Sequence, residues 1–205
     1  VDKPAKVDGQ YGTMVNGTLT PETVTLGDTL TVGRFEVTRA QFQAYDSEFE
    51  IPAGTPNYPA NGISAEVAEA YVEWLRKQTG RDYRLPTAAE LAALKKARSG
   101  AAENTPAYWA GFNPNLDEAR HLRTRLAQHA TDALLMPVGS RPPGHGENGA
   151  GPLLYDVDGN VAEWARTDDG LRAENASAVT LTRPKSDTAP AVPSRMIGLR
   201  VVLDR

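Results

Sequence analysis

The segment DVDGNVAEW, residues 156–164, contains the densest group of side chains in this sequence that could do chemistry. It places Asp156, Asp158 and Glu163 within nine residues, together with Gly159 and Asn160. Three carboxylates at this spacing could form a calcium loop, a catalytic acid/base cluster, or a charged turn between two strands. The sequence must be tested against each of these readings.

The residues at the key positions of this segment exclude an EF-hand calcium loop. An EF-hand loop needs glycine at its sixth residue and a bidentate glutamate at its twelfth. If Asp156 is the first residue, these positions hold Val161 and Thr167. The segment is therefore not an EF-hand, and the carboxylate cluster and the charged turn stay open.

The sequence contains no other recognisable catalytic or metal-binding motif. There is no cysteine, which excludes disulfides, thiolate metal sites and cysteine nucleophiles. His121 and His129 are eight residues apart, about 12 Å along a regular helix, and could not share a metal there. No Gly-x-Ser-x-Gly elbow, P-loop or dinucleotide-binding fingerprint occurs.

Composition narrows the classes further. With 40% apolar and 23% charged residues, the 205-residue chain is typical of a soluble globular domain, and no apolar run is long enough to predict membrane insertion. The net charge of −4 argues against a nucleic-acid partner, which requires a basic surface. The 18 glycines and 15 prolines predict many turns and loops.

Two helices have clear start signals in the first half of the chain. The spacing predicts a short helix after Thr38 and a longer one over 65–78, with Ser64 as its N-cap and Gly80 just beyond its end. In the longer helix, Val67, Tyr71 and Leu75 recur every four residues and are expected to be buried. Residues 24–37 alternate in part and predict two short strands or a hairpin, with a turn near residues 27–28.

A third helix is predicted from residue 88 to about residue 98, because Thr87 and Glu90 form the sequence pattern of a capping box. Residues 104–121 are expected to be rich in loops, and residues 165–195 to be irregular. Strands are expected near 153–155 and 160–164, and a final strand over 197–203. Residues 1–20 are expected to be an extended lead-in to a single domain over 21–205.

Four blocks, in order, resemble one family. They are GRFEVTRAQFQAY near the start, GISAEVAEAYVEWLRKQTGRDYRLPTAAEL in the centre, PLLYDVDGNVAEW, and IGLRVV at the end. Together they are similar to the formylglycine-generating enzyme, or sulfatase-modifying-factor, family. The resemblance implies an α+β fold of the C-type lectin-like kind, with short strands, two to three helices and much irregular loop.

The same resemblance argues against the family's reaction. The enzyme of this family uses a pair of cysteines that bind copper, and this chain has none. The usual Arg-Gly-Gly-Ser-Trp block before the terminal strand is also missing. We therefore expect a non-catalytic member without copper or iron, which binds a protein, peptide or glycan. The alternative is an enzyme of the same superfamily with altered, non-cysteine chemistry.

The resemblance also implies a calcium ion in the segment over 156–164, where family members often hold one. Carried over by position, the ligands would be the side chains of Asp156 and Glu163 and the backbone carbonyls of Gly159 and Val161. Calcium takes six to eight hard oxygen ligands and accepts such a mixture. The ion would be structural. A weaker second site would include Asn115 and Leu116.

In this fold, loops on a stable base carry the ligand surface. Here the loop over 139–151 and the segment over 165–195 would supply it, through His145, Arg172, Asn175, Arg183 and Arg195. Trp109, from the loop-rich stretch over 104–121, would add to this surface. The chain is expected to be an accessory or sensor domain of a larger bacterial protein, or the variable protein of a diversity-generating retroelement. Cytoplasm, periplasm and cell surface all remain open for it.

Overall fold

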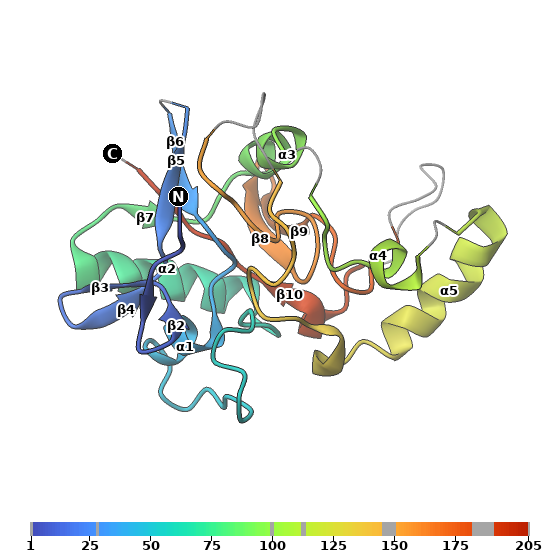
Figure 1. Ribbon diagram of the computed structural model, residues 1–205, viewed down its shortest axis with the longest axis horizontal. Helices are drawn as coiled ribbons and strands as arrows, with labels where there is room; N and C mark the ends of the chain where they lie inside the picture. The colour runs from blue at the N-terminus through green and yellow to red at the C-terminus, as the bar shows by residue number, and fades with distance from the viewer. Residues whose placement is uncertain are drawn as a thin grey trace.

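The computed structural model describes residues 2–27, 29–98, 101–111, 114–144, 151–181 and 191–204. Short strands and helices alternate with long irregular segments (Figure 1). The helices are α1 (Arg39–Gln43), α2 (Ala65–Thr79), α3 (Ala88–Lys96), α4 (Pro106–Ala110) and α5 (Leu116–Gln128). This is the expected α+β architecture, with more helix than the sequence predicted.

A four-stranded antiparallel sheet joins the two ends of the chain. Its order is β5 (Thr23–Leu26), β6 (Leu30–Gly33), β11 (Val202–Leu203) and β7 (Tyr83–Arg84). The β5–β6 pair is the predicted hairpin. Because β11 lies between β6 and β7, the last strand of the chain is central in this sheet. It therefore closes the fold rather than extending it.

Helix α2 begins and ends as predicted. The Ser64 hydroxyl accepts a hydrogen bond from the amide of Val67, and Gly80 adopts the left-handed conformation with φ of 66°. Tyr71 and Leu75 are fully buried in the main core. Val67 is 37% exposed, so its predicted burial is wrong. Ala68 and Val72 are buried beside Tyr71, as their place on the same face of the helix predicts, and the buried face also includes Thr79.

The first twenty residues are more regular than expected. They form two hairpins, one from β1 (Lys6–Val7) and β2 (Gln10–Tyr11), the other from β3 (Thr13–Val15) and β4 (Thr18–Thr20). The hairpins lie beside α1 (Figure 1). Their turns use residues with positive φ, namely Asp8, Gly9, Asn16 and Gly17. Asn, Asp and Gly tolerate this region, so the turn signal was present in the sequence.

A three-stranded sheet lies next to the 156–164 segment. Its order is β10 (Ile197–Gly198), β8 (Ala162–Thr167) and β9 (Gly170–Glu174), with β10 parallel to β8. Residues 165–174, predicted to be irregular, are thus mostly strand. The predicted final strand is split between two sheets, because the chain leaves β8 at Gly198 and reaches β6 at Val202. Residues 153–155 form an isolated bridge through Leu154 rather than a strand.

The helices of the middle region lie to one side. Figure 1 shows α4 and α5 away from α2 and the N-terminal hairpins. The sequence predicted loops over most of this region, but Thr105 precedes a helix with proline in its first turn, and Asn115 caps α5. His121 lies on α5 and His129 just after it, and both are exposed. Among the described residues, no helix is of a length and apolarity that would cross a bilayer.

Candidate functional site

The 156–164 segment lies at the centre of a buried polar network. Asn160 is fully buried with φ of 67°, and its side-chain amide is saturated. It accepts hydrogen bonds from Asn104 Nδ2 and from the Met136 amide, and donates to Glu36 and to the Met136 carbonyl. Each of these bonds is 2.9–3.1 Å long. Asn160 therefore ties three distant segments together.

Glu36 follows β6 and reaches the same point from the other side. Its carboxylate accepts hydrogen bonds from the side chain of Asn160 and from the amide of Val161, at 2.9 and 3.0 Å. Glu36 is only 1% exposed. Burial raises the pKa of Glu36 well above its ordinary value, and the nearby charges of Asp156 and Glu163 raise it further.

Arg200 is the cation of this network. Its guanidinium is wholly buried, and its Nε donates to Glu163 Oε1 at 2.8 Å. The other nitrogens donate to the carbonyls of Gly33, Tyr155 and Asp156. Arg200 thus joins β6, the 156–164 segment and β8 by four hydrogen bonds. This is the environment that a buried guanidinium requires.

Negative charge exceeds positive charge around Arg200. The carboxyl groups around it are those of Glu36, Glu103, Asp156, Asp158 and Glu163, and the other cations are Arg98, Arg141 near Asp156, and Lys95, which pairs with Asp158. Desolvation raises the pKa of Glu163 to about 7 and that of Asp156 to about 6, although Arg200 opposes both shifts. Such an excess is relieved by protons or by a bound cation.

The predicted calcium ligands lie in this network. Asp156 has φ of 52°, and its carboxylate accepts a hydrogen bond from the Gly139 amide at 2.7 Å. Glu163 pairs with Arg200 through one oxygen, and its other oxygen is buried without a hydrogen-bond partner. That free oxygen and the excess of negative charge suit a hard cation. Among the described residues, however, no three acidic or histidine side chains gather into a metal site, so calcium would depend on peptide carbonyls.

Close packing explains the glycine of the segment. A Cβ on Gly159 would lie 2.9 Å from the Cβ of Glu103 and 3.0 Å from backbone atoms of Asn104. The amide of Asn160 donates to the carbonyl of Asn104 at 2.8 Å across this contact. Asp158 then leaves the interior, where it accepts from the Ala176 amide and pairs with Lys95 at 2.6 Å. The segment is thus anchored on both sides.

In this structure, Asn115 of the second predicted calcium site caps helix α5. The side-chain oxygen of Asn115 accepts hydrogen bonds from the amides of Asp117 and Glu118, and the carboxylate of Glu118 accepts from the Asn115 amide. These are the bonds of a helix cap, and Leu116 is the first residue of α5. A calcium ion at Asn115 stays a prediction, and it would have to compete with this cap.

The predicted ligand-surface residues are scattered. Trp109 is 48% exposed on α4, and its indole lies 3.4 Å from the Ala178 carbonyl. Arg172 pairs with Glu174 on β9, Asn175 donates to the Val157 carbonyl, and Arg195 donates to the Ala130 carbonyl. No described contact joins Trp109, Arg172 and Arg195 to one another. His145 and Arg183 lie outside the described residues.

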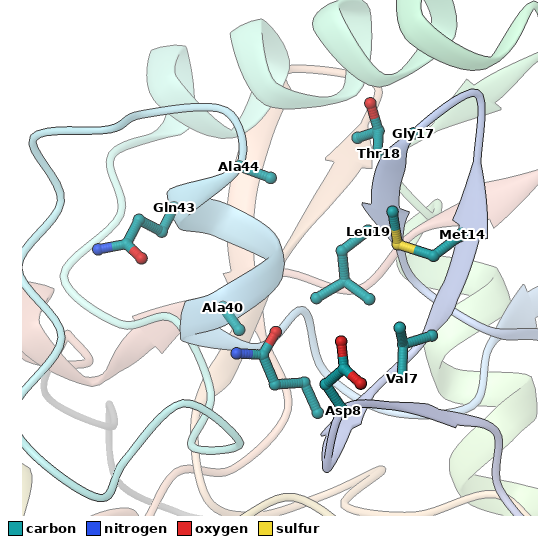
Figure 2. A pocket seen from close by; sticks show the side chains of 10 residues that line it. Val7, Asp8, Met14, Gly17, Thr18, Leu19, Ala40, Gln43 and Ala44 are labelled. Carbon is teal, nitrogen blue, oxygen red and sulfur yellow. The ribbon is translucent and has the colours of Figure 1, made fainter.

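A groove of about 490 Å³ opens at the N-terminal hairpins, and sequence reasoning missed it. Figure 2 shows Met14 and Leu19 of the β3–β4 hairpin facing Ala40 and Ala44 of α1, with Val7 and Asp8 closing one end. The described lining is apolar at Val7, Met14, Leu19, Ala40 and Ala44, and polar at Asp8, Gln10, Thr18 and Gln43. Asp8 is the one charged residue of that lining.

The central residues that sequence reasoning missed carry one signal. Glu36 and Arg200 each stand between large apolar residues, in FEV and LRV. A charged residue within an apolar stretch is expected to be buried with a partner. The two residues are 164 positions apart, so this signal predicts that each is buried but does not predict which residues each one contacts.

Comparisons with known proteins agree with the fold. The family model described as "Sulfatase-modifying factor enzyme 1-like domain" matches residues 6–204. PvdO from Pseudomonas aeruginosa is similar in structure, with a TM-score of 0.51, 21% identity, and coverage of 89% of this chain and 83% of PvdO. Treponema denticola variable protein 1 is also similar in structure, with a TM-score of 0.54, 16% identity, and coverage of 100% of this chain and 99% of that protein. A search of curated proteins found no match.

Proposed function

Because the chain belongs to the family of the sulfatase-modifying factor enzyme 1-like domain, we propose that it is a non-catalytic binding module, which holds an extended segment of a partner protein in its N-terminal groove. The groove between the two hairpins and α1 is the observation that carries the proposal (Figure 2). The other support comes from what the family motif does in this chain.

The polar groups of the motif are used inside the molecule. Glu163 bonds to Arg200, and Glu36 and Asn160 bond to each other, all with exposures of 1% or less. The sequence also lacks the cysteines on which the resemblance would base oxidation chemistry. Groups in this state build a scaffold, while the groups that face solvent are left to bind partners.

The groove has the features of a peptide site. Its floor offers Leu19, Ala40 and Ala44 to an apolar side chain, and Met14 is 49% exposed at its wall. Both hairpins are two-stranded sheets among the described residues, so each strand keeps an edge that no strand pairs. An extended peptide can add to such an edge while its side chains enter the groove. Asp8 favours a partner with a basic residue there.

Selection from a displayed library of random linear peptides tests the groove. Bound peptides should combine an apolar residue with Lys or Arg, and Met14→Glu or Ala44→Arg should weaken their binding by about tenfold or more, since both side chains face the groove. Val67→Glu is the matched control, because Val67 is an exposed apolar residue on α2. Peptides that bind the groove variants as tightly as the parent protein would contradict the proposal.

The enzymatic alternative has its own test. Mass-spectrometric metal analysis of the purified protein should find neither copper nor iron in stoichiometric amount. Either metal at one per chain would favour an enzyme with altered chemistry instead. The likeness to a variable protein concerns the fold, so the retroelement origin stays a prediction. A neighbouring reverse-transcriptase gene would support it.

We also propose that a structural calcium ion shares the buried network with Arg200, through Asp156, Glu163 and the carbonyls of Gly159 and Val161. The free oxygen of Glu163 and the excess of carboxylates support this. Asp156 also accepts a hydrogen bond from Gly139, so Asp156→Asn should lower the melting temperature even in chelator. The test is therefore the difference: calcium should raise the melting temperature of the parent protein and have no effect on Asp156→Asn. Equal responses would rule the site out.

A further inference from the structure

Helix α4 carries two adjacent aromatic side chains that are open to solvent. Tyr108 is 41% exposed and Trp109 is 48% exposed. The other large apolar side chains exposed in the described structure are Met14 and Val67, which lie apart from each other on the β3–β4 hairpin and on α2. Large aromatic rings gain free energy when a partner covers them, and they are enriched at protein interfaces. The aromatic pair is therefore a candidate contact surface.

Arg141 lies against the ring of Tyr108. The central carbon of its guanidinium group is 4.1 Å from the ring centroid, which is a cation–π contact. Its Nε is shielded from solvent, whereas its two terminal nitrogens reach solvent and have no hydrogen-bond partner among the described residues. The chain just before it is fixed, because the Gly139 amide donates to the carboxylate of Asp156 at 2.7 Å. Two accessible donors are thus held on the edge of an aromatic ring.

The 156–164 segment also holds α4 in place. Asn104, two residues before the helix, donates from Nδ2 to the side-chain oxygen of Asn160 at 3.0 Å. At the other end of α4, the indole nitrogen of Trp109 lies 3.4 Å from the carbonyl of Ala178, whose amide donates to the Asn160 carbonyl at 2.8 Å. A surface fixed in this way loses little conformational entropy when it binds.

We propose that Tyr108, Trp109 and Arg141, here called the aromatic platform, form a second docking surface, which binds an acidic segment of a partner protein. A guanidinium group binds a carboxylate through two parallel hydrogen bonds, so Arg141 selects Asp or Glu. The exposed rings then cover an apolar side chain next to that acid. Trp, Tyr and Arg are also the residue types that contribute most to binding energy in protein interfaces.

The aromatic platform is distinct from the N-terminal groove in position and in charge. Figure 1 shows α4 away from the hairpins that form the groove. The groove has Asp8 as its charged residue and favours a basic partner residue, whereas the platform has Arg141 and favours an acidic one. The two proposals can therefore succeed or fail separately.

A differential selection of displayed random linear peptides tests the platform. Peptides that bind a Trp109→Ala, Arg141→Met double variant are discarded first, which removes groove binders because the groove is intact in that variant. The remaining peptides that bind the parent protein should carry Asp or Glu beside a large apolar residue. Each single variant should weaken their binding about tenfold or more. The absence of any such peptide, or survivors without an acidic residue, would overturn the proposal.

A double-mutant cycle locates the acidic contact. Replacing the peptide Asp or Glu by its amide should weaken binding to the parent protein and have little effect on binding to Arg141→Met. Lys6→Met is the matched control, because Lys6 is an exposed cation whose Nζ lies 4.3 Å from the ring centroid of Tyr11, and its loss should leave these peptides bound as before. Equal effects of the amide on the parent protein and on Arg141→Met would place the acid elsewhere and overturn the assignment.

Two further measurements keep the test decisive. Circular dichroism verifies that each variant folds, and Arg141→Met alone serves for the discarding step if the double variant does not. An array of acidic glycans is probed in parallel. Binding to the array that is lost in Trp109→Ala, with no peptide surviving the selection, would assign the platform to carbohydrate and overturn the protein partner.

Discussion

The role of a buried polar residue in this protein depends on whether its hydrogen-bonding groups have partners. Arg200 is buried with four acceptors, while Arg98 is buried with none among the protein groups described. The two guanidinium groups repel each other and compete for the same carboxylates. Arg200 therefore fastens the framework through its hydrogen bonds, whereas Arg98 is held in place by packing and by charge alone.

Arg200→Met should be among the most damaging substitutions in the chain. It leaves the carboxylate of Glu163 without its partner and three carbonyls without donors. Removing one member of a buried ion pair costs about 3–5 kcal/mol of unfolding free energy. Urea denaturation measures this loss. Arg166→Met is the control, since its surface pair with Glu69 is long and half exposed, and it should cost less than about 0.5 kcal/mol.

Asp2 gives the protein a specific response to acid. Hydrogen bonds from Arg34 and from the Leu153 amide lower its pKa from 3.8 to about 2. A carboxyl group with a lowered pKa stabilises the folded state above its ordinary pKa, and this stabilisation is lost as the pH falls from about 4 to about 2. Compared with Asp2→Asn, the parent protein should therefore lose more stability over this interval. Denaturation at several pH values measures it, and parallel curves for the two proteins would contradict the assignment.

At the scale of elements, capping holds the short helices in place. α1 and α3 both begin with a complete capping box, formed by Thr38 with Gln41 and by Thr87 with Glu90. Glu90 also binds Arg84 of β7 through both oxygens, at 2.7 and 2.8 Å. The cap of α3 is therefore also the joint between that helix and the four-stranded sheet.

Thr87→Ala should show how much this joint contributes. The hydroxyl group accepts a hydrogen bond from the Glu90 amide at 3.1 Å, and its loss should cost about 1 kcal/mol of unfolding free energy. Thr87→Ser is the matched control, because serine keeps the cap and should restore most of the stability. Thermal denaturation measures both variants. A serine variant as unstable as the alanine variant would show that the methyl group, and not the cap, is responsible.

At the scale of the whole molecule, the last strand closes the fold. β11 pairs with β6 on one side and β7 on the other, and the preceding Arg200 fastens the 156–164 segment to β6. Residues from the beginning, middle and end of the chain thus meet around one short strand. Folding should be cooperative for this reason, because no large part of the core exists without its C-terminal residues.

Hydrogen exchange measures that cooperativity. The amides of β11 should exchange about as slowly as those of α2, although they lie near the end of the chain, because only global unfolding would free them. The β1–β2 hairpin, which pairs two residues on each strand, should exchange much faster and serves as the internal comparison. Rapid exchange in β11 would show that the strand frays and does not close the fold.

The sequence by itself determined the features that depend on neighbouring residues. The caps of Thr38, Ser64 and Thr87 and the hairpin over 23–33 are local patterns, and each was found where it was predicted. The family resemblance gave the fold, because its blocks fix the order of these elements. The early hairpins and β9 were missed, since strands of two to five residues offer too few positions to show alternation.

Only the tertiary structure decided which polar groups meet. Glu36, the 156–164 segment with Asn160 and Glu163, and Arg200 lie far apart along the chain, and the sequence contains no measure of the distance between them. Burial then changed their chemistry, since it removed the water that would hydrate each charge and made every missing partner costly. For that reason the sequence could name DVDGNVAEW as a candidate site, while only the structure placed its polar groups in one buried network with Glu36 and Arg200.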